Sequence, residues 1–307
     1  MSFNQFSIAL LSPPDVLLDI FNLLSSLGLI IIMFSLGIKI NFVEIKKNFT
    51  EPKDLVTGLF FQVILIPIIG IIFVLITNFP PDIGIAILVI SCMPSAATSN
   101  FITSKINGDT SLSITLTSIC TFLTIYTIPF FLKLFSFVTK EDFSIFDVDF
   151  SGVIIKILTI ITLPIIVGML LKHYMPQIKK IEKNLDKISF VLFIIIIKLA
   201  IYLSAINIKN PVQNFIAVLS FMTMIIFLIL VTTKIMNTSF KKTKTLIAEA
   251  LLQNNILGFI VIFSISGTTV NLIATLAIYG VCQYLVFVLL WLTLLKNKSS
   301  IYNSEKI

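Results

Sequence analysis

The residue in this sequence most suited to chemistry is Glu249, an acid in the middle of a long apolar segment. It lies in residues 245–259, TLIAEALLQNNILGF, and three amides follow it at Gln253, Asn254 and Asn255. An ionisable side chain at that depth of a membrane span is costly and is usually functional. Consecutive amides compete for backbone hydrogen bonds, so we expect the helix to be interrupted here. Backbone freed in this way is tolerated only where it is buried or lines a cavity.

A second interruption is expected in residues 91–109, SCMPSAATSNFITSKINGD. Pro94 removes a helix hydrogen bond, and small or polar side chains follow it as far as Asn100. In the next segment Ser113 and Thr117 are four residues apart and share a helix face. Hydroxyl and amide oxygens with one carboxylate suit a hard cation. Two interrupted spans, one in each half, predict a transporter binding site; polar contacts that only join packed helices are the alternative.

The composition places these polar residues in a membrane protein. Of the 307 residues 57% are apolar and 12% are charged, and the mean hydropathy is +1.07. Soluble chains carry roughly a quarter charged residues, so most of this surface must face lipid. Apolar runs between polar breaks predict an all-α protein of about nine transmembrane helices. They are expected at about 16–38, 55–77, 83–106, 110–135, 152–172, 187–207, 212–235, 245–266 and 271–295.

Lysine positions predict how these spans are oriented. All 22 basic residues are lysines, and the gaps between apolar segments are alternately rich and poor in them. With nine spans, 17 of the 22 lysines fall on one side. Excess lysine marks the cytoplasmic side. We therefore expect a multi-pass protein of the cell membrane with its N-terminus outside and its C-terminus in the cytoplasm. Gly108 and Asp109 are expected to form a tight turn on the lysine-rich side.

Other classes of function are not indicated. The net charge of +7 comes from these loop lysines, so we expect lipid rather than nucleic acid as the partner. Cys92, Cys120 and Cys282 fall in apolar segments without metal-ligand spacing, and the single histidine, His173, lies in a lysine-rich loop. The spans contain no paired acids, Ser–His pair or His–Glu metal motif. An enzyme is therefore not expected.

The interrupted segments resemble those of the bile acid:sodium symporters. The similar stretches are IIMFSLGIKI (31–40), FFQVILIP (60–67), CMPSAATSNFITSKINGDTSLSITLTS (92–118) and EALLQNN (249–255). The resemblance implies one transporter domain, 1–307, of two inverted repeats with two crossed broken helices. Panel helices would be about 16–38, 152–172 and 187–207, and core helices about 55–135 and 212–295.

The resemblance also implies two sodium ions and a small organic anion as ligands. One sodium ion would use Ser99, Asn100, Ser113, Thr117 and Glu249. The second would use Gln62, Glu249 and Gln253 with the backbone carbonyls of Ala250 and Leu252. Asn254 matches a residue near the substrate.

Five positions bear on the substrate. The family's usual Pro-Gly-Gly is here Pro94-Ser95-Ala96, and a usual glycine is Leu251, which makes a bile acid a less secure expectation. Gln283 stands where a bacterial bile acid carrier has a histidine. Lys198 lies near the middle of its span, where a buried lysine could meet a substrate carboxylate, pair with a carbonyl or reach toward the interface. The chain has no arginine, and therefore no bidentate carboxylate clamp.

Together these features predict secondary active transport, in which sodium enters with an organic anion by alternating access. The anion would be bile acid-like or another amphipathic carboxylate or sulfate. A proton-coupled carrier with Glu249 as the relay is the nearest alternative. A channel or a receptor is the alternative from another class.

Overall fold

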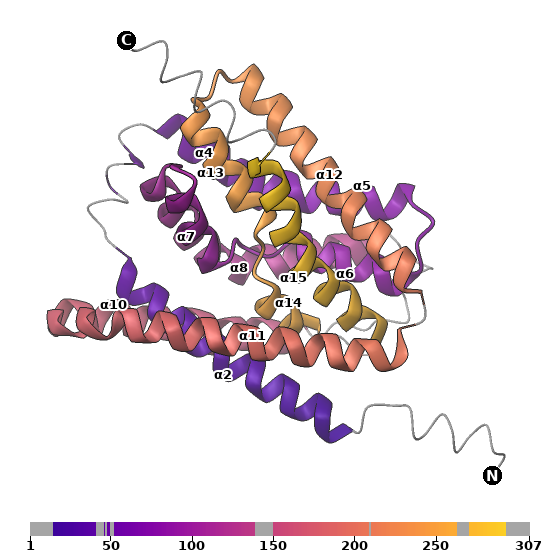
Figure 1. Ribbon diagram of the computed structural model, residues 1–307, viewed down its shortest axis with the longest axis horizontal. Coiled ribbons are helices and arrows are strands. Elements are labelled where there is room, and N and C mark those ends of the chain that lie inside the picture. The colour runs from indigo at the N-terminus through magenta and orange to yellow at the C-terminus, as the bar shows by residue number, and fades with distance from the viewer. Residues whose placement is uncertain are drawn as a thin grey trace.

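The computed structural model describes residues 15–40, 46, 48–49, 52–138, 150–208, 210–262 and 270–292. Helices make up nearly all of this part of the chain (Figure 1). They are α2 (Asp15–Lys39), α4 (Pro52–Phe60), η1 (Phe61–Leu65), α5 (Ile66–Ile76), α6 (Pro81–Ser91), α7 (Ala97–Lys105), α8 (Thr110–Val138), α9 (Phe150–Lys156), η2 (Ile157–Thr162), α10 (Leu163–Tyr174), η3 (Pro176–Ile181), α11 (Glu182–Asn207), α12 (Pro211–Ile235), α13 (Phe240–Leu251), α14 (Asn255–Ile262) and α15 (Val270–Leu290).

Six of the helical stretches within the described residues are long and apolar enough to cross a membrane. They are Leu17–Lys39, Pro52–Ile76, Thr110–Val138, Ser151–Tyr174, Pro211–Ile235 and Asn271–Leu290. Their bounds lie within a few residues of the expected spans. The protein is therefore a helical, multi-span membrane protein. The total of nine spans stays a prediction, because it also counts α11 and the two interrupted pairs α6–α7 and α13–α14.

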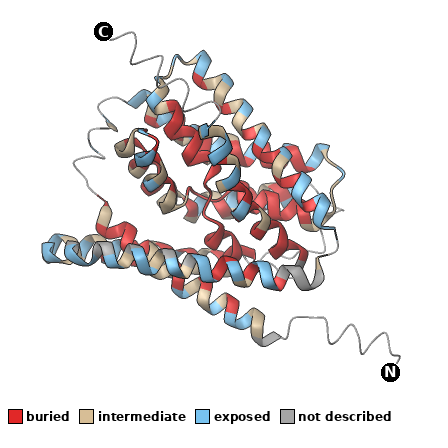
Figure 2. Cartoon of the chain, in the orientation of Figure 1, coloured by how far each residue is buried: buried red, intermediate tan, exposed pale blue. Residues whose placement is uncertain are grey.

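Both expected interruptions are present. The first helix stops at Ser91 and resumes at Ala97, and the second stops at Leu251 and resumes at Asn255. Almost every described residue of α13 and α14 is buried, which fits the rule that broken backbone at membrane depth must be enclosed by protein. Figure 2 shows the buried residues gathered in the body that surrounds these breaks, with exposed residues on the outer helices.

Helices α2, α10 and α11 form a group along one side of the molecule (Figure 1). Glycines let α2 and α10 approach closely. A Cβ at Gly37 would lie 2.3 Å from the carbonyl oxygen of Ile165, and one at Gly168 would lie 2.5 Å from that of Phe34. Small residues at such interfaces allow backbone contact in a solvent that offers little hydrophobic driving force.

Two spans contain π-helical turns, and each turn is followed by a proline. In η1 the Ile66 N–H bonds to the Phe61 carbonyl, and Pro67 comes next. In η2 the Leu163 N–H bonds to the Leu158 carbonyl, and Pro164 comes next. Proline donates no hydrogen bond, so the wider turn falls where the α-helical ladder is already broken. Such turns often occur at functional sites, and η1 contains the buried Gln62.

The Gly37 contact generates a test of the α2–α10 packing. Gly37→Ala should lower the stability of the folded protein by about 1–3 kcal/mol, because the new methyl group meets backbone that cannot move aside. The melting temperature of the purified protein in detergent measures this loss. Gly28→Ala is the matched control: its nearest atom is the flexible end of Ile196 at 2.8 Å. Equal melting temperatures for the two variants would contradict the close packing.

Candidate ion-binding site

The two interruptions cross each other, and their backbones pair where they meet. Ser95 and Gln253 form an antiparallel bridge. The Ala96 N–H donates to the Leu252 carbonyl at 2.7 Å, and the Asn254 N–H donates to the Pro94 carbonyl at 2.9 Å. Each interruption therefore satisfies backbone groups that the other has lost, which is a requirement for non-helical backbone inside a membrane.

The Glu249 carboxylate lies beside this crossing and is 4% exposed. Four hydroxyl groups donate to it, and they come from three segments of the chain. The donors are Ser95, Ser99 at 2.6 Å, Ser113 and Thr117 at 2.9 Å. A buried carboxylate needs such donors because hydrocarbon cannot replace its hydration.

Asn100 joins the same cluster. Its Oδ1 lies 2.7 Å from the Ser113 hydroxyl oxygen and 3.3 Å from the Thr117 hydroxyl oxygen. The structure thus brings together all five side chains expected for the first ion: Ser99, Asn100, Ser113, Thr117 and Glu249. Whether they bind sodium stays a prediction.

Ser95 was missed as a member of this cluster. It donates to Glu249 and lies 3.0 Å from the Thr117 hydroxyl. The sequence held one signal for it, the replacement of the family's first glycine after Pro94 by a residue with a hydroxyl group.

The residues expected for the second ion form an adjoining group. Gln62 Nε2 donates to the Gln253 side-chain oxygen and to the Met93 carbonyl, both at 2.8 Å. Gln253 Nε2 in turn donates to the Ala250 carbonyl at 2.8 Å. The Leu252 carbonyl accepts from the Ala96 N–H. These four predicted residues are therefore close together, but their polar atoms bond to one another.

This bonding pattern fits a cation. The Gln62 amide hydrogens face two oxygens, from Met93 and Gln253. If the amide rotates, the Gln62 oxygen faces the same pair, and a cation can take the place of the hydrogens. Neutral oxygens with one shared carboxylate suit monovalent, hard ions. No cluster of three or more His, Cys, Asp or Glu residues occurs among the described residues.

Neighbouring groups hold the crossing in place. The Tyr279 hydroxyl on α15 donates to the carbonyl of Leu251, the last residue of α13, at 3.1 Å. The Asn254 side-chain oxygen accepts from the Leu257 N–H at 3.1 Å and so caps the start of α14. Asn254, expected near the substrate, is therefore also a structural residue.

The other two substrate candidates differ from each other. Gln283 is fully buried, and neither polar atom of its amide has a hydrogen-bond partner within the described residues. Asn255 Oδ1 is also buried and has no hydrogen-bond partner within the described residues. Lys198 was considered as a buried lysine, but it is exposed on α11. The reason is its register, since the neighbouring Ile196 and Ile197 occupy the buried face of that helix.

The fold and the oxygen-lined crossing define a multi-span helical membrane protein with a site suited to small ions. Comparison with known families gives the finer assignment: residues 26–211 match the Sodium Bile acid symporter family, and the chain belongs to it.

Several curated proteins are similar to this chain. The hepatic sodium/bile acid cotransporter of Rattus norvegicus is 30% identical over 50% of this chain and 43% of its own length. The uncharacterized sodium-dependent transporter YocS of Bacillus subtilis (strain 168) is 25% identical over 74% of this chain and 70% of its own length. The probable sodium/metabolite cotransporter BASS1, chloroplastic, of Arabidopsis thaliana is 24% identical over 50% of this chain and 37% of its own length. The chain thus spans less than half of the rat and Arabidopsis relatives.

The Glu249 cluster generates a stability prediction. Without added ions, Ser99→Ala should destabilise the protein by about 1.5–3 kcal/mol, the range for a hydrogen bond to a charged group. Thermal unfolding in detergent and choline chloride is the measurement.

Ser118→Ala is the matched control for this change. Ser118 is also buried, but its hydroxyl donates to the Ile114 carbonyl within its own helix. A loss for Ser99→Ala no larger than that for Ser118→Ala would show that the hydroxyl groups do not stabilise the carboxylate.

Proposed function

We propose that this protein is a sodium-coupled symporter of an organic anion that works by alternating access. The observation that carries the proposal is the buried Glu249 carboxylate, which accepts hydrogen bonds from four hydroxyl groups where two interrupted helices cross. The family assignment and the sodium-dependent relatives support it.

In this proposal the two groups of oxygens hold two sodium ions. One ion lies among Ser99, Asn100, Ser113, Thr117 and Glu249. The other takes the place of the Gln62 amide hydrogens, near Gln253 and the carbonyls of Ala250 and Leu252. The hydroxyl groups can turn their lone pairs toward an ion because each is both donor and acceptor. One carboxylate offsets part of the charge of both ions.

The neighbours of Glu249 also bear on the proton-coupled alternative. The four hydroxyl groups both donate and accept, so they suit the ionised and the protonated carboxyl group alike. A proton relay would need no surrounding set of amide oxygens such as Asn100 and Gln62. Sodium therefore accounts for more of the cluster than a proton does.

The anion would lie on the other side of the crossing, between the group formed by α2, α10 and α11 and the rest of the protein. We assign the first group as the panel and the remainder, from α4 to α8 and α12 to α15, as the core. Among the described residues, both polar atoms of the buried Gln283 amide and the Oδ1 of Asn255 have no hydrogen-bond partner, and a polar substrate group can satisfy them. Lys198 on α11 adds a positive charge for a carboxylate or sulfate.

The orientation follows from the lysines. Seventeen of the 22 lysines lie at 39–53, 105, 172–187, 234–244 and 296–306, which a nine-span arrangement puts on one side. We place this lysine-rich side in the cytoplasm, with nine spans and the N-terminus outside.

Sodium binding is tested by thermal stability in sodium chloride against choline chloride. A ligand that binds only the folded state stabilises it, by about 2.7 kcal/mol at 100 times the dissociation constant. Sodium should raise the melting temperature of the wild type, and Glu249→Gln and Glu249→Ala should lose that rise. Asp19→Asn, which neutralises an exposed acid on α2, should keep it.

The same measurement discriminates the coupling ion. If sodium has no effect on the wild type while lower pH stabilises it, the protein is a proton carrier. If neither has an effect, coupled transport by this site is wrong.

Substrate binding is tested by uptake into proteoliposomes with an inward sodium gradient. The probes are a labelled bile acid, a 2-oxo acid, pantoate and a sulfated steroid. We expect saturable, sodium-dependent uptake of at least one of them. Gln283→Leu should raise its KM about tenfold, the effect of roughly 1.4 kcal/mol from a lost polar contact. The sodium-induced rise in melting temperature should survive in this variant. An unchanged KM would remove Gln283 from the substrate site.

A further inference from the structure

On the lysine-rich side of the Glu249 cluster, α7 and α13 each continue for one more helical turn. Thr103 follows Ser99 by four residues on α7, and Thr245 precedes Glu249 by four on α13, so each pair shares a helix face. Both threonines are fully buried. The turn that joins α7 to α8, residues Ile106–Asp109, packs against them. A cation moving straight from Glu249 to the lysine-rich side would meet this turn.

The turn fits tightly between the two threonines. Asn107 has a left-handed backbone with φ 55°, and the Gly108 N–H donates to the Thr103 carbonyl at 2.8 Å. A Cβ at Gly108 would lie 2.7 Å from Thr103 Cγ2 and 2.9 Å from Thr245 Oγ1. Only a glycine fits there without displacing a neighbour, so at this position the turn leaves no room for an ion.

Two hydrogen bonds fasten the turn to α13. The Asp109 N–H donates to Thr245 Oγ1 at 2.7 Å, and Lys244 Nζ donates to the carbonyl of Ile106 at the end of α7. The Lys244 side chain is 5% exposed, and its Nζ also lies 5.3 Å from the centre of the Phe240 ring. No carboxylate pairs with this ammonium group in the part of the chain that the structure describes. In its protonated form it places a positive charge that no carboxylate neutralises close to the route of any cation; burial and the neighbouring Lys241 charge lower its pKa.

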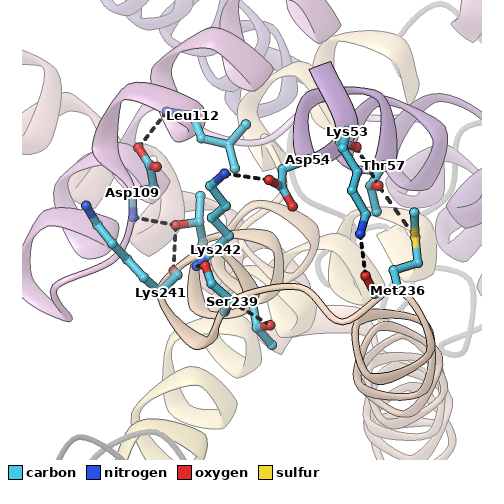
Figure 3. A network of polar contacts seen from close by, with 11 residues as sticks. Lys53, Asp54, Thr57, Asp109, Leu112, Met236, Ser239, Lys241 and Lys242 are labelled. Carbon is cyan, nitrogen blue, oxygen red and sulfur yellow. Dashed lines mark hydrogen bonds and ion pairs between the residues drawn. The ribbon is translucent and has the colours of Figure 1, made fainter. Parts of the chain in front are cut away.

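The start of α13 is itself anchored from the other side. Lys242 forms an ion pair with Asp54 of α4, and Lys53 donates to the Met236 carbonyl at 2.6 Å, in the turn before α13 (Figure 3). Asp109 faces α13 opposite these contacts, and its Oδ1 accepts from the Leu112 N–H at the start of α8. The start of α13 is therefore held by side chains of α4 as well as by its contacts with the α7–α8 turn.

We propose that the turn Ile106–Asp109 closes the ion site toward the cytoplasm, and that Lys244 and Thr245 hold it shut. Lys244 has two effects: its hydrogen bond fixes the turn, and its charge repels a sodium ion that approaches along α13. Sodium release then requires both hydrogen bonds to break and Gly108 to leave its place between the threonines. This inference extends the proposed sodium symport by naming the residues that control ion exit.

The test measures access to Thr103, which lies behind the turn. Thr103→Cys is made in the full chain, and inside-out membrane vesicles in choline chloride are treated with a membrane-impermeant cationic methanethiosulfonate. The new thiol should react slowly. Adding Lys244→Met should speed its modification about tenfold, the factor expected from one lost hydrogen bond. Lys241→Met is the matched control, since it removes an exposed lysine charge nearby, and it should leave the rate unchanged. Lys244→Arg, which keeps a donor for Ile106, should also leave it slow.

The native cysteines report on the fold in the same experiment. Cys92, Cys120 and Cys282 are buried and should stay unmodified while position 103 becomes accessible. If Lys244→Met exposes them as well, Thr245→Val decides, because it removes the acceptor for Asp109 and otherwise only a bond to the Lys241 carbonyl within α13. The proposal is overturned if Thr103→Cys reacts rapidly beside an intact Lys244. It is also overturned if neither Lys244→Met nor, where it is needed, Thr245→Val speeds the reaction. The assay contains no sodium, so its outcome does not depend on whether sodium raises the melting temperature.

Discussion

A charge that is buried in a membrane protein must be solvated by the protein itself, and the structure around Glu249 follows from this constraint. Hydrocarbon offers no donors, so four hydroxyl groups from three segments supply them. Ser95 can reach the carboxylate only because α6 has already ended at Ser91. The interrupted helices are thus the means by which residues more than 130 positions apart in the chain meet around one acid.

The interruptions create a second requirement, because they free backbone groups at a depth without water. The structure meets it by crossing the two breaks and pairing them across the Ser95–Gln253 bridge. Helix α15 satisfies one more backbone group beside the second break, because its Tyr279 hydroxyl donates to the Leu251 carbonyl. The free-energy cost of unpaired backbone groups therefore favours two breaks that meet at one place. The same meeting point brings together the side-chain and carbonyl oxygens of both breaks.

Local signals in the sequence predicted the spans and both interruptions, whereas the full set of residues around Glu249 was expected from the family resemblance. Apolar runs placed the spans, because lipid demands about 20 apolar residues per helix. Pro94 and the amides after Glu249 marked the interruptions. What could not be predicted depends on tertiary packing: the Met93 carbonyl beside Gln62, the Tyr279 contact and the hydroxyl of Ser95. The exposure of Lys198 could not be predicted either, because hydrophobicity alone does not tell which face of α11 is covered.

The wide turn at η1 has a consequence for how this family of sequences can change. A π-turn contains one residue more than the α-helix around it, so the loss of a single residue there leaves a fully bonded helix. Because an i→i+5 bond closes one turn over one residue more than an i→i+4 bond does, the segments on the two sides of such a deletion would keep their relative orientation. Gln62 and Pro67 lie on either side of that point. The loss of one residue between Gln62 and Pro67 would thus leave Gln62 facing Gln253 in a continuous membrane span, so this span can shorten by one residue while its group of oxygens stays intact.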